Sequence, residues 1–157
     1  MATSSGKIRL KSMEGHLFEI ERDAAMLSPV LSHVIEDIVD KASSSSSVVV
    51  PVFNGTTKTL AKIVEYMKNH AENKDQERTK LAKEKLEFVE GFEDMDELLD
   101  VMNLASYLDL SVLLRLVAAR VAFVINDMTV EEIRSLFKIQ GDYTVEEEAE
   151  LGTAWAF

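Results

Sequence analysis

The sequence predicts an α+β fold, in which a small sheet and its helices are followed by a helical C-terminal extension. Two observations carry this prediction. Patterns typical of strands are confined to residues 7–20 and 48–50, whereas apolar residues recur at helical spacing from residue 95 onward. The length of 157 residues fits one domain with an appendage, and folding can bury about 70% of the unfolded chain's surface.

The first elements are a hairpin and a helix. Residues 7–11 and 16–20 alternate polar and apolar side chains, and Glu14-Gly15 between them is a turn signal. Ser28-Pro29 predicts a helix start, because a hydroxyl cap is followed by proline at the first helical position. The apolar spacing that follows predicts a helix over residues 29–40 with one apolar stripe.

The middle of the chain is expected to hold one more strand, one more helix and a linker. After the serine run 43–47, a flexible segment, Val48 to Val50 fit a buried strand whose end Pro51 places near an edge. A second amphipathic helix is predicted over about residues 56–69. Residues 71–87 carry dense charge of both signs and indicate a solvated linker with some helical tendency.

The rest of the chain is predicted to be helical. One apolar stripe runs from residue 95 to 105. Residues 112–125 are apolar almost all round, which predicts a central, buried helix. Thr129 and Thr144 each precede a glutamate by three residues, the capping-box pattern in which the two side chains satisfy each other's free amide groups.

Composition excludes several classes of partner. The formal net charge of −11 opposes binding to phosphate backbones and to anionic membrane leaflets, so we expect no nucleic acid and no membrane as partners. The absence of cysteine excludes disulfides and thiolate metal sites. No secretory leader is recognisable in residues 1–6, and no apolar run is long enough to span a bilayer. We therefore expect the cytoplasm and nucleus as location.

No constellation of residues predicts catalysis, a metal or a cofactor. His16, His33 and His70 are far apart in sequence, and none has a carboxylate at metal-ligand spacing. The acidic runs 93–97 and 146–148 lack the alternating ligands and the central glycine of a calcium loop. Both runs fall at predicted helix starts, where negative charge stabilises the helix. Nucleotide-binding and nucleophile motifs are also missing, so we predict that the chain is not an enzyme.

Several segments, read in order, resemble the Skp (S-phase kinase-associated) family of ubiquitin-ligase adaptors. Residues 8–20 are similar to its opening strands, and residues 105–110 with 113–114 resemble its A-N-Y-L-D/N-I…L-L signature. Residues 129–144 resemble T-P-E-E-I-R…F-N-I…D-F-T, and 155–157 resemble the W-A-F ending common in plant members. The resemblance covers nearly the whole chain apart from residues 71–87.

The resemblance implies an adaptor of an SCF (Skp-cullin-F-box) ubiquitin ligase. It implies a BTB/POZ-like domain over residues 6–127 that binds a cullin, and an extension over residues 128–157 that binds an F-box protein. Ser106 and Tyr107 match the Asn-Tyr pair that touches the cullin, with serine in place of asparagine. The positions that match the apolar F-box contacts are Val121, Val124, Ile133, Phe137, Ile139 and Trp155.

Several alternatives stay open from the sequence. Tyr107 is out of phase with the stripe of residues 95–105, which favours an outward side chain. Trp155, the only tryptophan, can anchor a partner or fold back to close the core. The segment before Trp155 is about two residues shorter than the family pattern. If this segment is a continuous helix, the deletion turns the Trp155 side chain by roughly 200° about the helix axis. If Gly152 breaks the helix, Trp155 can still reach the same pocket. A homodimeric or elongin-C-like BTB module is the alternative function, and weak self-association is open.

Overall fold

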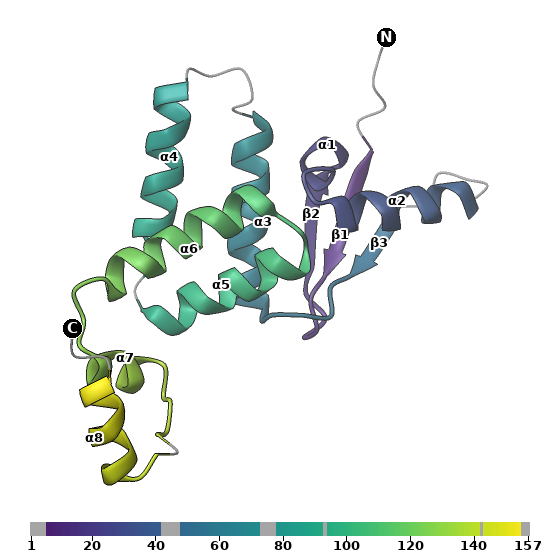
Figure 1. The fold of residues 1–157 in the computed structure, drawn as a ribbon. Coiled ribbons are helices and arrows are strands. Elements are labelled where there is room, and N and C mark those ends of the chain that lie inside the picture. The colour runs from purple at the N-terminus through teal and green to yellow at the C-terminus, as the bar shows by residue number, and fades with distance from the viewer. Residues whose placement is uncertain (1–5, 42–47, 73–77, 93, 142, 155–157) are drawn as a thin grey trace. The chain divides into compact units, whose positions relative to one another are not determined.

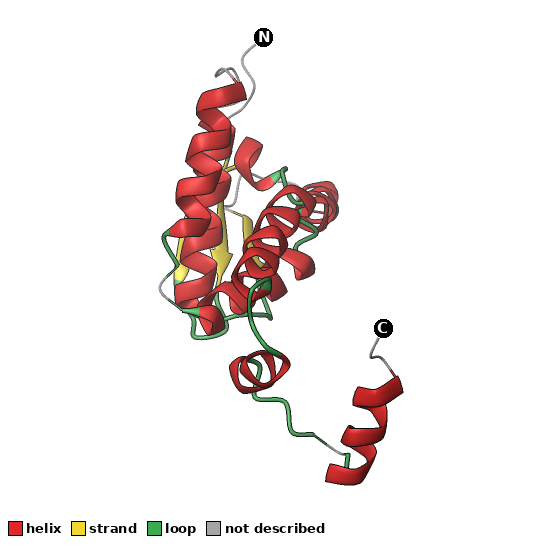
Figure 2. Cartoon of the chain, turned by 60° about the vertical axis from the view of Figure 1, so that its left-hand side comes forward, coloured by secondary structure: helices red, strands yellow, loops and turns green. Residues whose placement is uncertain are grey.

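The computed structural model describes residues 6–41, 48–72, 78–92, 94–141 and 143–154 (Figure 1). The chain forms two compact units, residues 1–123 and residues 124–157. The first unit holds a three-stranded sheet and most of the helices, and the second holds two short helices (Figure 2). Helices therefore dominate an α+β architecture, as the sequence predicted.

The sheet has the strand order β2-β1-β3. Strands β1 (Lys7–Lys11) and β2 (Leu17–Glu21) pair antiparallel through a turn in which Gly15 has a φ of 90°. Strand β3 (Val48–Pro51) pairs with β1 in parallel and forms one edge. The predicted hairpin and the predicted valine strand are both confirmed, and so is the position of Pro51 at an edge.

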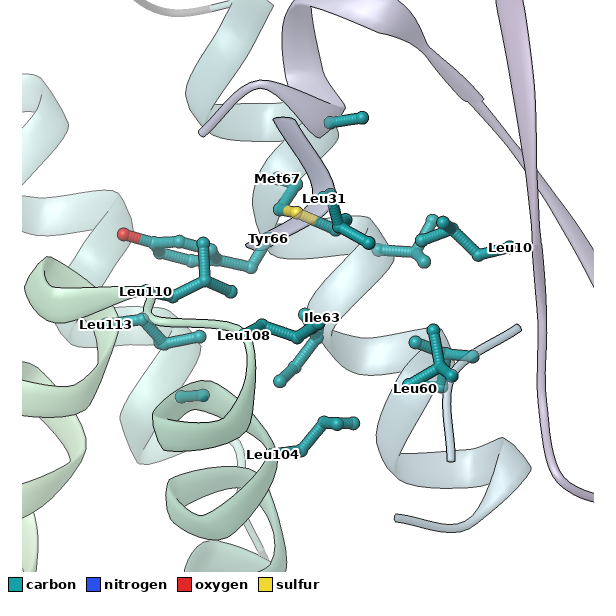
Figure 3. Packing of buried hydrophobic residues seen from close by; sticks show 14 of the residues in the cluster. Leu10, Leu31, Leu60, Ile63, Tyr66, Met67, Leu104, Leu108, Leu110 and Leu113 are labelled. Carbon is teal, nitrogen blue, oxygen red and sulfur yellow. The ribbon is translucent and has the colours of Figure 1, made fainter. Parts of the chain in front are cut away.

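In the described part of the first unit, six helices surround one hydrophobic core. The side chains of Leu10 on β1, Leu31, Ile63, Met67 and Leu104 meet in this core, where each is almost fully buried (Figure 3). The helices are α1 (Arg22–Ala25), α2 (Pro29–Lys41), α3 (Thr57–Glu72), α4 (Arg78–Glu90), α5 (Met95–Tyr107) and α6 (Ser111–Ile125).

The charged stretch 71–87 is largely helical where the structure describes it. Helix α3 continues to Glu72, and α4 begins at Arg78. Val89 near the end of α4 is buried, and the Phe88 ring lies 5.4 Å from that of Tyr66 on α3. The apolar residues at the end of α4 thus fix to the core a helix whose sequence is otherwise charged.

Helix α6 confirms the predicted helix but not its predicted burial. Among its apolar side chains only Leu113 and Val117 are fully buried. Val112 is exposed, and Phe123 is 73% exposed. The prediction of a central, buried helix is therefore wrong, because one side of α6 packs on the core while apolar residues on other sides stay open.

The second unit contains α7 (Val130–Leu136) and α8 (Val145–Ala154). Both capping boxes are present. The amide of Thr129 donates to the Glu132 carboxylate at 2.8 Å, and the amide of Thr144 donates to Glu147 at the same distance. Helix α8 runs through Gly152, so the alternative in which this glycine breaks the helix is wrong. Trp155 lies outside the described residues.

Candidate protein-interaction surfaces

The start of α5 is fixed by a cap and by two ion pairs. The Asp94 carboxylate accepts a hydrogen bond of 2.7 Å from the amide of Glu97. The Glu97 side chain, itself largely shielded, lies 2.9 Å from Lys58 Nζ and 3.3 Å from Lys62 Nζ on α3. Since the pairs with Lys58 and Lys62 tie α5 to a core helix, the direction of α5 is set at its first turn.

The end of α5 is a Schellman motif, which fixes Ser106 and Tyr107 in the last turn. The amide of Leu110 donates to the carbonyl of Ala105 at 2.9 Å, and that of Asp109 donates to Ser106 at 3.1 Å. Asp109 has a φ of 54°, the left-handed conformation that this motif requires and that glycine usually supplies. Leu110 and Ala105 are buried, which adds the apolar contact typical of the motif.

A buried serine attaches this turn to the rest of the first unit. Ser28 is completely buried, and its hydroxyl donates a hydrogen bond of 2.6 Å to the carbonyl of Leu108. The same oxygen accepts the amide of Leu31 at 3.2 Å, so Ser28 also caps α2. The predicted cap is confirmed, and Ser28 has a second role, because its hydroxyl also holds Leu108, 80 positions further along the chain.

Ser106 and Tyr107 lie together on the surface of this fixed turn. The backbone on both sides is held, because Leu104, Ala105 and Leu108 are buried. Ser106 is exposed and Tyr107 is 40% exposed. The outward direction predicted for Tyr107 is confirmed, and the pair forms a rigid, open platform of one hydroxyl and one aromatic ring.

Helix α6 presents apolar residues that its own unit does not cover. Val121 is half-buried against the core, whereas Phe123 is largely exposed, with the Arg120 guanidinium 5.6 Å from its ring centroid. An exposed phenylalanine on a helix marks a contact site more often than a scattered aliphatic residue does. Phe123 was not predicted as a contact residue, because the apolar sequence of this helix predicts burial on all sides.

The second unit has an apolar side that remains open. Among its described residues none is buried: Ile133, Leu136 and Phe137 are half-buried, and Ile139 is 56% exposed. An ion pair of 2.7 Å between Arg134 on α7 and Glu148 on α8 joins the two helices. Unit 124–157 therefore leaves Ile133, Phe137 and Ile139, which the sequence predicts as contact residues, at least partly open to solvent.

The end of α7 shapes this open side. Helix α7 ends in a second Schellman motif, with the amide of Ile139 on the carbonyl of Arg134 at 2.9 Å and that of Lys138 on Ser135 at 3.2 Å. Lys138 takes the left-handed position with a φ of 56°. The motif turns the chain directly after Phe137 and leaves Ile139 exposed, while Val124 at the beginning of the unit is half-buried.

Comparison with known proteins identifies the family of this chain. Residues 6–72 match the domain described as "Skp1 family, tetramerisation domain". Residues 111–154 match the domain described as "Skp1 family, dimerisation domain". SKP1-like protein 14 of Arabidopsis thaliana is 39% identical over 158 residues, which cover 98% of this chain and 99% of that protein. The chain belongs to the Skp1 family.

Other Skp1 relatives match over almost the same length. SKP1-like protein 1A of Arabidopsis thaliana is 36% identical, with 98% of this chain and 99% of the relative covered. The S-phase kinase-associated protein 1 homolog of Tetrahymena thermophila is 32% identical over 96% of this chain and 93% of its own length. Membership of the Skp1 family implies the role of an adaptor in an SCF-type ubiquitin ligase, built on a BTB/POZ-like fold.

Titratable groups in the described part of this Skp1-family chain form no metal-binding cluster. No group of three or more histidine, aspartate or glutamate side chains there is arranged to hold a metal ion. Burial raises the pKa of Tyr66, and hydrogen bonds from Thr144 lower the pKa of Glu147 at the start of α8. Both shifts have structural causes in core packing and helix capping.

None of the helices in the described ranges has both the length and the apolar character needed to cross a bilayer.

Proposed function

We propose that this protein bridges an F-box protein to a cullin, so that a substrate held by the F-box protein is ubiquitinated. The observation that carries the proposal is the openness of the second unit. Helix α7 carries Ile133 and is capped by Phe137 one turn later, Ile139 follows two residues on, and no described side chain of the unit is buried. An apolar side that a short segment cannot close by itself is typical of a protein interface.

The F-box site is proposed to lie in residues 128–157 together with the end of α6. The residues proposed to contact the F-box are Val121, Val124, Ile133, Phe137, Ile139 and Trp155. Phe137 is the best placed of the described set, because the turn after α7 holds it at the helix end. Aromatic anchors of this kind commonly dominate binding energy.

The cullin site is proposed to lie in residues 6–127, centred on Ser106 and Tyr107. These two residues stand on a turn that is held from within by Ser28 and by the buried Leu108. A rigid platform loses little conformational entropy on binding, which favours a stable contact from few side chains.

The test uses two reciprocal variants, with binding measured by isothermal titration against a cullin N-terminal domain and against an F-box segment. Phe137→Ala is expected to weaken F-box binding by about tenfold or more and to leave cullin binding unchanged. Tyr107→Ala is expected to do the opposite. Each variant is thus the folding control for the other, and loss of both affinities in one variant would indicate a folding defect.

Two outcomes count against the proposal. If the wild-type chain binds neither partner while it remains folded, the bridging function is wrong. A stable dimer by light scattering, with no affinity for either partner, would favour a homodimeric BTB module instead. Trp155→Ala is expected to weaken F-box binding with little loss of fold, and an unchanged affinity would remove Trp155 from the site.

A further inference from the structure

The sheet has one face that the helices do not cover. Along the strands every second side chain is buried: Ile8 and Leu10 on β1, Ile20 on β2, and Val50 and Val52 at β3. The side chains between them point the other way and are exposed or half-exposed. This open face is separate in residues from the proposed F-box and cullin contacts.

One end of the open face holds one cation and two anions. Lys7 and Glu19 form an ion pair of 2.7 Å, and Glu21 is the register partner of Lys7 across the β1–β2 ladder. The cation at this end is therefore already paired within the sheet, and the end offers little to an acidic partner.

The other end combines cations with exposed apolar side chains. Arg9 lies between Glu19 and Val49 in the ladder, and Lys11 lies between Leu17 and Pro51. Neither Arg9 nor Lys11 makes an ion pair within the described part of the chain, and Arg9 Nε is buried there without a hydrogen-bond acceptor.

Phe53 extends the apolar border of this end. The ladder closes with the amide of Val52 on the carbonyl of Lys11 at 2.8 Å, and Phe53 follows directly. Like Val49 and Pro51, which precede it at every second position, Phe53 is exposed, with 71% of its surface open to solvent. Leu17 on β2, the register partner of Lys11, is 51% exposed. An exposed phenylalanine directly after β3, whose neighbouring strand β1 carries Arg9 and Lys11, marks a contact surface.

We propose that this end of the sheet face is a docking surface for an acidic protein segment that carries large apolar side chains. The surface, called the Arg9–Lys11 face, consists of Arg9, Lys11, Leu17, Val49, Pro51 and Phe53. Carboxylates of the segment pair with the guanidinium and the ammonium group, and its apolar side chains cover Phe53 and Leu17.

Charge decides between a short segment and a larger anion. The open face as a whole holds three cations and two anions, whereas the chain carries a net charge of −11, so the remainder carries −12. A membrane surface or a nucleic acid would bring its charge close to this remainder and be repelled. A short acidic segment needs to approach only the local cations.

The backbone favours docking on the face over extension of the sheet. A strand added beside β3, the edge that borders this end of the face, would lack a hydrogen bond, because Pro51 has no N–H to donate. Side-chain contacts therefore supply the affinity, and these can be removed one at a time.

The test measures fluorescence anisotropy of a labelled short peptide of alternating glutamate and leucine, titrated with the full chain at low salt. Saturable binding is expected, and Lys11→Glu and Phe53→Ser should each weaken it by about tenfold. The matched control is Lys83→Glu, an exposed lysine of α4, which changes the net charge equally and should alter the affinity by less than about twofold.

Several results would overturn the docking proposal. Absence of saturable binding overturns the proposal. So does equal weakening by Lys11→Glu and Lys83→Glu, or equal affinity for a peptide with serine in place of leucine, since either result indicates non-specific electrostatics. Binding of anionic vesicles that is lost in the same two variants, without peptide binding, would assign the face to a membrane instead. The circular dichroism spectrum checks the fold of each variant.

The Phe137→Ala and Tyr107→Ala affinities test the adaptor function independently. Because they use other residues and other ligands, failure of the Arg9–Lys11 face leaves that function intact.

Discussion

Replacing Ser28 with alanine removes two hydrogen bonds from a site that water does not reach. The hydroxyl caps α2 by accepting the Leu31 amide at 3.2 Å, and it donates to the Leu108 carbonyl at 2.6 Å. Loss of the helix cap costs about 1 kcal/mol. Leaving the buried carbonyl of Leu108 without its donor costs a further 1–3 kcal/mol or so. The expected destabilisation of Ser28→Ala is therefore about 2–4 kcal/mol.

The assay is urea unfolding of the whole chain, followed by circular dichroism. With a urea m value of about 2 kcal/mol/M, a loss of about 3 kcal/mol lowers the midpoint by about 1.5 M. Ser32→Ala is the matched control, because the Ser32 hydroxyl only donates a 3.3 Å bond to Glu36 on the surface. Its effect should stay within about 0.5 kcal/mol. A Ser28→Ala variant as stable as Ser32→Ala would refute the reasoning that Leu108 depends on this hydroxyl.

Three further predictions concern turns and caps. Gly55→Ala should cost about 1–3 kcal/mol in urea unfolding, because Gly55 has a φ of 77° and an added Cβ would lie 3.0 Å from Leu104 Cδ2 on α5. Asp109→Val should cost about 1–2 kcal/mol in the same assay, and Asp109→Gly nothing, since the φ of 54° suits glycine; equal costs would contradict this. Thr144→Ala should raise the pKa of Glu147 in an NMR titration, because it removes the 3.0 Å hydroxyl hydrogen bond that helps to lower this pKa, while the backbone amide bond of residue 144, the larger cause, remains. The pKa of Glu147 is lower in the folded chain than in the unfolded chain. The cap therefore stabilises α8 at pH values above the ordinary pKa of glutamate, and this stabilisation is lost as the pH falls below about 4.

Local patterns in the sequence predicted most elements of the fold. The hairpin, the cap at Ser28 and the boxes at Thr129 and Thr144 each depend on residues within a few positions of one another. Such patterns act through backbone geometry and nearby hydrogen bonds, which a single segment specifies by itself. The elements they predict are therefore found close to where the sequence places them.

Features set by distant contacts could not be predicted in this way. The bond from Ser28 to Leu108 joins residues 80 positions apart, and nothing near either residue indicates it. The two Schellman motifs were also missed, because Asp109 and Lys138 occupy positions where glycine is the usual signal. These motifs set where Tyr107 and Ile139 stand, so the candidate surfaces depend partly on conformations that composition does not reveal.

The misjudged burial of α6 shows why an adaptor is difficult to interpret from hydrophobicity. A helix that is apolar on all sides must be covered on all sides, but the covering atoms can belong to the same chain or to a partner. Leu113 and Val117 are covered from within, whereas Phe123 is not. The second unit extends this argument, because its described residues include none that is buried. Apolar surface that the chain itself leaves open stabilises the unit only when a partner covers it. The stability of the second unit should therefore rise with the fraction of chains that have a partner bound.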